Sequence, residues 1–499
     1  MGRLSINTLE GRMGAKDAEV IVVGCGIAGL SAAVAAQEDG ARVVVLERAP
    51  IDERGGNTRY TGAWMRMQNE SDISDDFTEH FAANMGGPID PSLLHLTATP
   101  ATTWPPVLRS MSFADPEVVS TLAEEAAPTL RWLRRFGVRF ARLETPFLTS
   151  VQPRIAPSGG GLAMIEALAT HLERGGGTIH YEVAAQELIQ GPTGAVEGVR
   201  CIGPGNRPVI FRTKATVLAC GGFQGNAEMM AQYIGPRAAY LRAMSRGCYF
   251  NKGEGIRMAL AIGAAPCGDY GGWHASPMDP RSDRAGPSIY IYPYGILVNC
   301  NGCRFVNEAP GPTDETYEGI GRAISGQPGG IAFAIVDASV ADVPLASTAI
   351  RTEQPAVEAA DLAQLAAKLD LPAVTLEESV AHYNDACVRG RFSPLELDGL
   401  STRGLDPCKS NWARPVTEPP FQAWPIISSV VFTFGGLKVN KSAQALNTQG
   451  DPIPGLYVAG ETMGLYYGSY TGATSVLKGA VFGRIAGTDA ARRYRIANG

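Results

Sequence analysis

Apolar runs and helical stretches alternate at the start of the chain. Residues 19–23 form a short β-branched run, residues 30–38 form an alanine-rich stretch with helical character, and residues 42–46 form a second apolar run. A glycine-rich segment, residues 24–29, joins the first run to the helix. This order predicts a strand, a tight turn, a helix and a second strand.

The same pattern returns much later in the chain. Residues 216–223 form an apolar run that ends in a glycine turn, and residues 455–461 repeat this arrangement. An alanine- and glycine-rich helix follows, opened by residues 472–479. We therefore expect the end of the chain to return to the domain that its beginning forms.

The middle of the chain differs in character. It is rich in proline and aromatic residues and carries helical patterns at residues 356–368 and 375–389. Thr375, followed three residues later by Glu378, predicts a capping box at the start of the second helix. We expect a domain inserted into the first one, with these bounds: 17–267 for the first part, 268–431 for the inserted domain and 432–499 for the second part.

Length, composition and charge narrow the class of protein. A chain of 499 residues suggests two or three structural units, and 45% hydrophobic with 18% charged residues is ordinary for a soluble enzyme. The net charge of -6 and the scattered basic residues argue against nucleic-acid binding. No apolar run of about 20 residues is present to span a membrane, and residues 1–16 lack the apolar segment of a secretory signal. We expect a cytoplasmic protein.

The nine cysteines are odd in number and irregular in spacing, which argues against a disulfide framework. Cys300 and Cys303 form a C-x-x-C pair, for which a redox or metal site is one interpretation. Asn301 and Gly302 lie between them, and this turn between two strand-like segments favours a hairpin. Because partner ligands are lacking, the sequence predicts no metal site.

The first glycine segment carries the strongest chemical signal. Gly24, Gly26 and Gly29 form a G-x-G-x-x-G pattern that allows a tight turn, close approach of a pyrophosphate and close helix packing. The helix start that follows directs its unpaired N–H groups at phosphates. Glu47 follows Gly29 by 18 residues, near the ~20 expected for a ribose-binding acid. The segment predicts a bound dinucleotide without distinguishing NAD from FAD.

Later segments distinguish NAD from FAD through a family resemblance, which is carried by residues 53–59, 293–299, 409–413, 433–436 and 480–484. The chain resembles the FAD-binding fumarate reductases, ketosteroid dehydrogenases and tricarballylate dehydrogenases over residues 17–490, most of all the tricarballylate dehydrogenase branch. The resemblance implies an α/β fold, with a Rossmann-like FAD-binding domain and an inserted α+β domain that caps the substrate.

The resemblance also implies a set of FAD contacts. Covalently linked relatives carry a histidine near Asn57 and Thr58, and residues 54–67 contain none, so we expect non-covalent FAD. The implied contacts are Gly24, Gly26, Ile27, Ala28, Gly29, Glu47, Arg48, Gly55, Gly56, Asn57, Thr58, Thr61, Gly62, Ala184, Ala219, Gly221, Gly222, Gly460, Glu461, Ser475, Val476 and Leu477.

The chain departs from the fumarate reductases where those enzymes use cations. It keeps the family's motif at residues 304–308, but no arginine follows in residues 309–314. Phe432 stands at the family's second histidine, and the C-terminal arginine is replaced within residues 469–471. Fumarate reduction is therefore disfavoured, because a dicarboxylate needs such cations. His274 matches the family's first histidine, with a structural histidine as the competing interpretation.

Tyrosines take the place of the missing cations. Tyr290, Tyr292 and Tyr294 alternate along a predicted strand and would share one face, while Tyr466, Tyr467 and Tyr470 precede the last helix. Aromatic packing is the competing interpretation for each one. As a group they resemble the tyrosine-lined sites of ketosteroid dehydrogenases. The predicted catalytic residues are His274, Tyr294, Tyr467 and Tyr470.

These features predict an FAD-dependent dehydrogenase, a desaturase that forms a C=C bond beside a carbonyl or carboxylate. An α-proton would be abstracted and the β-hydride would go to flavin N5. The expected substrate is a small carboxylic acid, cyclic ketone or keto acid, and the electron acceptor is open between oxygen, a quinone and a redox protein. The alternatives are an enoate reductase of the fumarate type and a non-catalytic flavin electron-transfer subunit.

Overall fold

Buried apolar segments build the central sheet, as the sequence pattern predicts. The computed structural model describes residues 16–83, 90–100, 103–142 and 154–498. The six strands of this sheet are β2 (Val20–Val23), β3 (Val43–Leu46), β6 (Thr178–His180), β10 (Ala215–Leu218), β19 (Gln444–Leu446) and β20 (Pro452–Val458). Their order is β19-β20-β10-β2-β3-β6, and every neighbouring pair except β19 with β20 is parallel. Buried parallel strands read as continuous apolar runs, which explains the pattern of residues 19–23.

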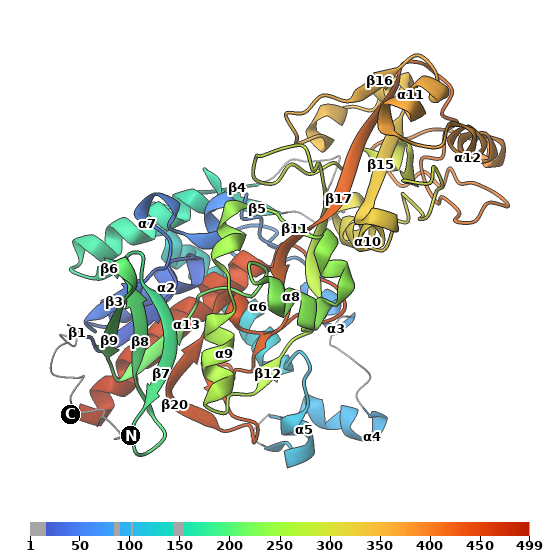
Figure 1. Ribbon diagram of the computed structural model, residues 1–499. Helices are drawn as coiled ribbons and strands as arrows, with labels where there is room; N and C mark the ends of the chain where they lie inside the picture. The colour runs from blue at the N-terminus through green and yellow to red at the C-terminus, as the bar shows by residue number, and fades with distance from the viewer. Residues whose placement is uncertain (1–15, 84–89, 101–102, 143–153, 499) are drawn as a thin grey trace, which may run out of the picture.

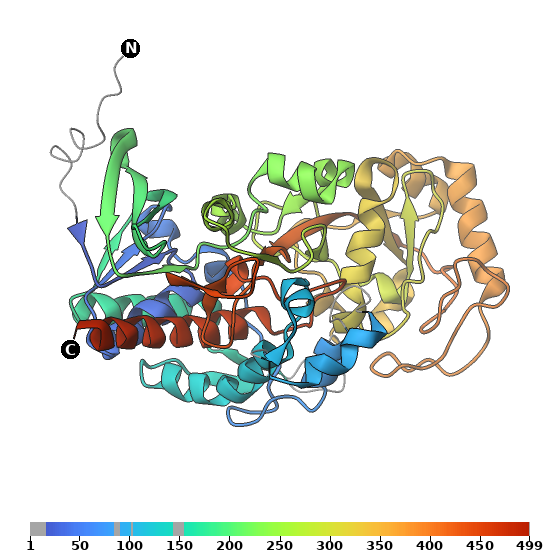
Figure 2. The ribbon, with the colours of Figure 1, turned by 90° about the horizontal axis from the view of Figure 1, so that it is seen from below.

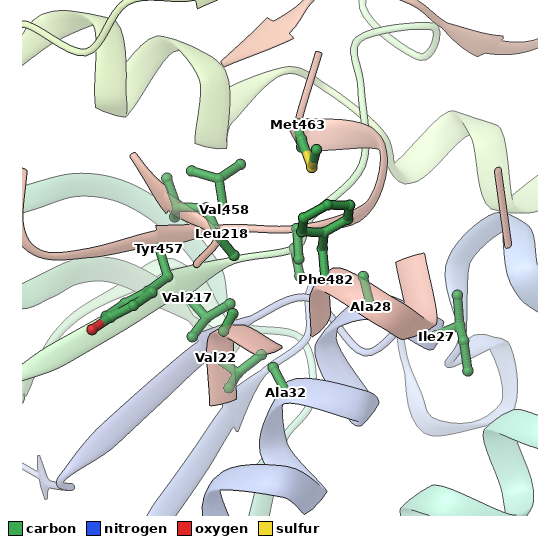
Figure 3. Close-up of a cluster of buried hydrophobic side chains, with 14 of the residues drawn as sticks. Val22, Ile27, Ala28, Ala32, Val217, Leu218, Tyr457, Val458, Met463 and Phe482 are labelled. Atoms are coloured by element: carbon green, nitrogen blue, oxygen red, sulfur yellow. The ribbon is translucent and has the colours of Figure 1, made fainter. Parts of the chain in front are cut away.

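Two helices from opposite ends of the chain pack together against this sheet (Figure 1). They are α2 (Ile27–Glu38) and α13 (Ser475–Asn498). A Cβ atom on Gly483 would lie 2.2 Å from the carbonyl oxygen of Ala28, so only glycine permits this approach. Side chains of both helices and of β2, β10 and β20 meet in one apolar cluster (Figure 3). The end of the chain thus completes the domain that its beginning forms, as predicted.

Further elements surround the central sheet. A second sheet has the order β1-β9-β8-β7, and two antiparallel two-stranded sheets pair β4 with β5 and β12 with β18. These strands are β1 (Lys16–Asp17), β4 (Phe140–Arg142), β5 (Ile155–Pro157), β7 (Ala184–Gln190), β8 (Val196–Gly203), β9 (Arg207–Arg212), β12 (Pro266–Cys267) and β18 (Gly436–Leu437). The helices are α3 (Phe77–Ala83), α4 (Pro91–Leu94), α5 (Pro106–Ser110), α6 (Pro116–Arg134), α7 (Gly160–Arg174), α8 (Ala227–Ile234) and α9 (Glu254–Ala261).

One long strand connects this larger body to a smaller one, the cap. Strand β17 (Phe421–Thr433) pairs with β11 and β13 through its second half and with β15 and β16 through its first half. The cap lies to one side of the larger body, with α12 at its far end (Figures 1 and 2). The remaining elements are β11 (Arg242–Ala243), β13 (Trp273–Met278), β14 (Ile296–Asn299), β15 (Ile331–Val336), β16 (Val357–Ala359), α10 (Thr313–Ser325), α11 (Leu362–Leu369) and α12 (Ala373–Ala386).

The cap has its own apolar interior, as an inserted domain requires. Two clusters of buried residues draw their members from residues 289–426 alone. The fold is therefore α/β with an α+β insertion, which confirms the predicted class. The boundaries at residues 268 and 431 stay a prediction, because β13 and β17 are shared between the two bodies.

Three local predictions in the cap are wrong. The first cap helix begins at Leu362 instead of residue 356, because β16 occupies part of that segment. The second begins at Ala373, so Thr375 lies inside its first turn and forms no capping box. Tyr292–Tyr294 forms a 3₁₀ turn, so the three predicted tyrosines do not alternate along one strand. Pro293 lacks the N–H that a strand ladder needs, and this signal was in the sequence.

The segment around the C-x-x-C pair is confirmed as a tight turn. It follows β14, and Val298 pairs with Arg304 across it. The backbone N–H groups of Asn301 and Cys303 both donate to the side-chain oxygen of Asn299. Across the residues described, no helix is long and apolar enough to cross a membrane.

Candidate functional site

A cleft of about 480 Å³ opens where β2, β3 and β10 end, and we call it the glycine cleft. The ends of parallel strands are where doubly wound folds bind their ligands. Of the predicted cofactor contacts, Gly29, Gly222 and Leu477 do not line it. Those that do are Gly24, Gly26, Ile27, Ala28, Glu47, Arg48, Gly55, Gly56, Asn57, Thr58, Thr61, Gly62, Ala184, Ala219, Gly221, Gly460, Glu461, Ser475 and Val476.

The backbone of the glycine turn fits a pyrophosphate. Gly24 has φ +105°, and a Cβ there would lie 2.3 Å from the carbonyl oxygen of Ala219. A Cβ on Gly29 would lie 1.9 Å from the carbonyl oxygen of Gly24, so this glycine is needed for helix packing although it does not face the cleft. Gly26 caps α2 and has no side chain to bond to the first turn, while the N–H of Ile27 donates to the hydroxyl oxygen of Thr58 at 3.3 Å. The next N–H groups of the helix start point toward the cleft, where a helix N-terminus favours a bound anion.

Glu47 lies at the end of β3 and faces the same cleft. Only 6% of its surface is exposed. One carboxylate oxygen accepts the N–H of Cys25 at 2.8 Å and the other accepts the N–H of Ala49 at 2.7 Å. Burial raises the pKa of this carboxyl. Each oxygen keeps a second lone pair for a hydroxyl donor such as a ribose, so Glu47 fits its predicted role and also holds the glycine turn.

A second acid, which is partly buried, and a buried lysine lie further along the cleft. Glu461 accepts the N–H of Thr433 at 2.9 Å, and burial raises the pKa of its carboxyl. The ammonium group of Lys478 donates to the carbonyl oxygen of Met463 at 2.8 Å. Burial lowers the pKa of Lys478 to about 7. Sequence reasoning missed Lys478, although its position one turn after Ser475 on the same helix pointed to it.

A smaller space adjoins the glycine cleft, and we call it the side cavity. Its volume is about 210 Å³. The cap and the larger body both contribute to its walls. It shares with the cleft the residues Thr61, Gly62, His274, Tyr290, Tyr317, Arg351, Val431, Phe432, Ser475 and Val476, and it adds Trp64, Arg154, Thr313, Asp314, Tyr470, Gly472 and Ala473.

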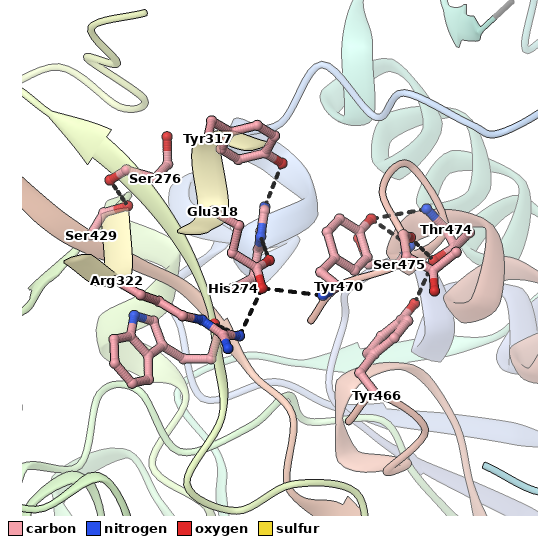
Figure 4. Close-up of polar contacts among 12 residues, drawn as sticks. His274, Ser276, Tyr317, Glu318, Arg322, Ser429, Tyr466, Tyr470, Thr474 and Ser475 are labelled. Carbon is pink, nitrogen blue, oxygen red and sulfur yellow. Dashed lines mark hydrogen bonds and ion pairs between the residues drawn. The ribbon is translucent and has the colours of Figure 1, made fainter. Parts of the chain in front are cut away.

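A chain of three hydrogen-bonded side chains lies at the junction of cleft and cavity (Figure 4). His274 on β13 bonds through Nδ1 to a carboxylate oxygen of Glu318 at 2.8 Å and through Nε2 to the hydroxyl of Tyr317 at 3.2 Å. The other oxygen of Glu318 accepts from Arg322 at 2.7 Å, which keeps this carboxylate an acceptor. Nδ1 of His274 then carries the proton, and Nε2 accepts the Tyr317 hydroxyl. Although the ring of Tyr317 faces the cavity, desolvation raises the pKa of its phenol well above the usual value.

Tyr470 joins this chain to the start of α13. Its backbone N–H donates to Glu318 at 3.2 Å, and its ring lies 4.5 Å from that of His274. Its phenol oxygen accepts the N–H groups of Thr474 and Ser475, each at 2.9 Å. His274 and Tyr470 are thus brought together as predicted, with the positive end of a helix dipole beside them.

Two of the four predicted catalytic residues lie elsewhere. Tyr294 packs on Trp412 inside the cap and donates its hydroxyl to the carbonyl oxygen of Pro394. The hydroxyl of Tyr467 accepts the N–H of Gly268 at 2.8 Å within the larger body. Neither residue lines the cleft or the side cavity. Ring packing explains the position of Tyr294 and hydrogen bonds of its hydroxyl explain that of Tyr467, so the catalytic role of both stays a prediction that these positions do not support.

The structure supplies cations that the motif positions lack. Arg154 from the larger body and Arg351 from the cap both line the side cavity. The sequence pattern missed them because neither belongs to a family motif. It also missed Tyr317 and Glu318, for which the only signal was Arg322 one helical turn after Glu318.

Comparisons with known proteins agree with this geometry. A family model described as FAD binding domain matches residues 19–477. NADH:fumarate oxidoreductase of Klebsiella pneumoniae (strain 342) is 27% identical over 96% of this chain, which spans only 48% of that protein. 4-Oxocyclohexanecarboxylate 2-dehydrogenase of Sinomonas cyclohexanicum is 25% identical, with 92% of this chain and 90% of that protein covered.

A solved structure also matches the fold of this chain. The 3-ketosteroid-Δ4-(5α)-dehydrogenase of Rhodococcus jostii RHA1, in complex with 4-androstene-3,17-dione, matches with a TM-score of 0.69 at 25% identity. The match covers 98% of this chain and 99% of that one. The predicted resemblance to fumarate reductases and ketosteroid dehydrogenases is therefore confirmed. The assignment to the tricarballylate dehydrogenase branch stays a prediction.

Proposed function

This chain belongs to the FAD binding domain family, and we propose that it is an FAD-dependent oxidoreductase that dehydrogenates a CH–CH bond beside the carbonyl of a small ketone or acid. Relatives named for fumarate, 4-oxocyclohexanecarboxylate and a ketosteroid support this class of reaction. The cleft provides the backbone and the acid that a flavin dinucleotide needs. Bound FAD supplies a hydride acceptor.

The observation that carries the proposal is the hydrogen-bonded chain of Tyr317, His274 and Glu318 beside the cleft. Desaturation removes an α-proton as well as a hydride, so a proton acceptor must face the substrate. Tyr317 alone is a poor base, because burial raises the pKa of its phenol. His274 solves this problem, since it accepts the hydroxyl proton of Tyr317 as the phenol oxygen takes the proton from carbon. Glu318 then stabilises the positive charge on the imidazole ring, as the acid does in a Ser-His-Asp triad.

Tyr470 and the start of α13 complete the reaction site. An α-proton becomes acidic only when the neighbouring carbonyl is polarised. The N–H groups of Thr474 and Ser475 converge on the Tyr470 oxygen, which currently donates to the Ser475 hydroxyl at 3.0 Å. A substrate carbonyl oxygen beside the Tyr470 hydroxyl would accept the phenol proton in a hydrogen bond, and the two backbone N–H groups that donate to the phenol oxygen make this phenol a stronger donor. His274 and Tyr470 keep the catalytic roles predicted for them, and Tyr317 takes the place of Tyr294 and Tyr467.

The side cavity bears on the alternative functions. A flavin subunit that only transfers electrons has no use for a cavity lined by proton-transfer groups, so an enzyme is favoured. The same residues would serve the reverse reaction, in which Tyr317 returns a proton to an enoate carbon. The direction is therefore a matter for experiment.

The test is anaerobic reduction of the flavin by candidate substrates. Tricarballylate, 4-oxocyclohexanecarboxylate and a 3-ketosteroid are mixed with the purified protein, and the loss of flavin absorbance is followed by stopped flow. We expect a ketone or acid from this panel to bleach the flavin, and Tyr317→Phe and His274→Gln to slow bleaching by roughly 100-fold or more, the effect of a lost general base. Tyr467→Phe is the matched control, because it removes a phenol outside the cavity, and its rate should not change.

Two outcomes would overturn the proposal. If Tyr317→Phe and His274→Gln bleach as fast as the wild type, the proton chain has no part in the reaction. If no compound of the panel bleaches the flavin, but chemically reduced protein is rapidly reoxidised by fumarate or an enone, the protein is a reductase.

A further inference from the structure

Lys478 occupies an unfavourable place for a cation. It lies in the first turn of α13, only 2% of its surface is exposed, and it lines the glycine cleft. Burial disfavours the charged form of a lysine, and so does the positive end of a helix dipole. This position suits a lysine best when a negative charge can lie beside it in the cleft.

The contacts of its ammonium group leave donors for such a charge. Within the described part of the chain, the group donates to the carbonyl oxygen of Met463 at 2.8 Å and lies 4.6 Å from the ring centre of Tyr466. It forms no ion pair with a carboxylate of the described residues. An ammonium has three N–H donors, so its hydrogen bond to Met463 does not exhaust them.

Three titratable groups of the described residues face Lys478. Burial raises the pKa of Glu461, and the N–H of Thr433, 2.9 Å away, acts against this by favouring the carboxylate. Burial also raises the pKa of Cys267 and of Tyr466, which keeps both uncharged. The pKa of Lys478 is lowered to about 7 by burial, and Glu461 acts in the opposite direction. A change of charge in the cleft can therefore decide whether Lys478 holds its proton near neutral pH.

Lys478 lies at the end of the cleft that adjoins the side cavity. Ser475 and Val476, on the same turn of α13, line both spaces. The turn that fits a pyrophosphate precedes α2 instead. The reactive ring of a flavin must lie against the substrate, so the ring end of FAD belongs at the start of α13. That ring carries the negative charge of a reduced flavin.

We propose that Lys478 takes up a proton when the flavin in the glycine cleft is reduced, and that it balances the charge of the reduced ring. Two electrons and one proton convert the flavin to its anionic reduced form, with the proton on N5 and the negative charge over N1 and the C2 carbonyl. A second proton, from solvent, converts the amine of Lys478 to an ammonium. Reduction then leaves the net charge of the cleft unchanged.

The physical reason is the interaction between the two charges. An anion beside a buried lysine favours the charged form and raises its pKa. In turn, the ammonium stabilises the reduced ring relative to the oxidised one. This inference requires FAD as the cofactor, but neither the substrate nor the direction of the proposed function.

The midpoint potential of the bound flavin measures this proton. It is determined at a series of pH values by equilibrating the FAD-loaded protein with redox dyes, so no substrate is needed. For a two-electron couple, each proton taken up lowers the potential by about 30 mV per pH unit, the equivalent of a tenfold change in proton concentration. Above about pH 7, we expect the potential to fall by about 60 mV per pH unit in the wild type and by about 30 mV in Lys478→Met.

Two further variants complete the test. Lys478→Arg keeps a cation that does not titrate, so it should show the smaller slope at a higher potential than Lys478→Met. It carries the decision if Lys478→Met fails to bind FAD. Lys438→Met is the matched control, because Lys438 is also buried, donates to the carbonyl oxygen of Met111 at 2.9 Å and has a pKa lowered by burial. Lys438 lines neither the cleft nor the side cavity, so its replacement should keep the wild-type slope.

The outcomes distinguish this inference from the proposed function. Equal slopes in the wild type and the Lys478 variants would overturn it, since a lysine that is charged or neutral in both states takes up no proton. The absorption spectrum of the reduced wild type must be that of the anionic ring, because a neutral ring above pH 7 would place the second proton on N1 and also overturn it. If the slopes differ as expected and no compound of the substrate panel bleaches the flavin, the role of Lys478 stands and the proposed dehydrogenation fails.

Discussion

Replacing Glu47 by glutamine tests the cofactor site at its most constrained residue. Both carboxylate oxygens accept buried backbone N–H groups, from Cys25 at 2.8 Å and from Ala49 at 2.7 Å. Glutamine keeps one oxygen and puts an NH₂ group in place of the other, so one N–H loses its acceptor. An unsatisfied buried donor costs about 1–3 kcal/mol. If Cys25 is the donor that loses its partner, the glycine turn itself is disturbed.

The bond to the cofactor weakens as well. A charged hydrogen bond contributes about 1.5–3 kcal/mol and a neutral one about 0.5–1.5 kcal/mol, so the ribose contact should lose about 1–2 kcal/mol. We therefore expect the dissociation constant for FAD to rise by about 5- to 30-fold. It is measured by titrating FAD-free protein with FAD and following the quenching of flavin fluorescence.

Glu19→Gln is the matched control for this substitution. Glu19 precedes β2, at the opposite end of that strand from the glycine turn, and accepts the N–H of Arg42 at 2.7 Å. It does not line the cleft, so its replacement should cost stability and leave FAD affinity unchanged. An unchanged dissociation constant in Glu47→Gln would refute the assignment of Glu47 to the ribose.

Three further predictions address the cofactor link, the packing and the cap. FAD should be released into the supernatant by acid or heat, and flavin that stays with the precipitated protein would contradict a non-covalent cofactor. Gly487→Ala should lower the thermal midpoint, because its Cβ would lie 2.0 Å from the carbonyl oxygen of Ala32, whereas Gly319→Ala, with open space at its Cβ, should not lower it. Burial lowers the pKa of Lys409 to about 8. Between pH 8 and about 10 the unfolded chain therefore keeps a proton on Lys409 that the folded chain has lost, so the folded state gains stability as the pH rises. Measured by denaturant titration, the free energy of unfolding of the wild type relative to Lys409→Met should increase by roughly 1–2 kcal/mol over this range. A constant difference between the two proteins would mean that Lys409 does not titrate in this range.

The local sequence was enough to predict the part of the protein that forms the glycine cleft. The glycine turn, the strand before it, the helix after it and Glu47 all lie within residues 19–47, and the spacing alone places the acid beside the turn. Steric requirements of the backbone explain why this works. At Gly24 and Gly29 any side chain would collide with a carbonyl oxygen, so the residue type itself reports the local geometry. The return of the last helix to this domain could also be predicted, because its small residues match a close helix contact.

Only the tertiary structure determined which residues line the side cavity, where we propose that the substrate binds. Tyr317, His274 and Arg351 belong to different cap segments, and their meeting depends on how α10 packs across β13 and how the cap sits on the larger body. A tyrosine looks the same in the sequence whether its hydroxyl faces a cavity or bonds to a nearby carbonyl oxygen, as that of Tyr294 does. Arg154 and Arg351 line the side cavity although neither lies in a family motif, and no spacing in the sequence connects them. Any segment that reaches a cavity can supply its charged and aromatic side chains. The sequence therefore shows which residues could line the cavity, and the tertiary packing determines which of them do.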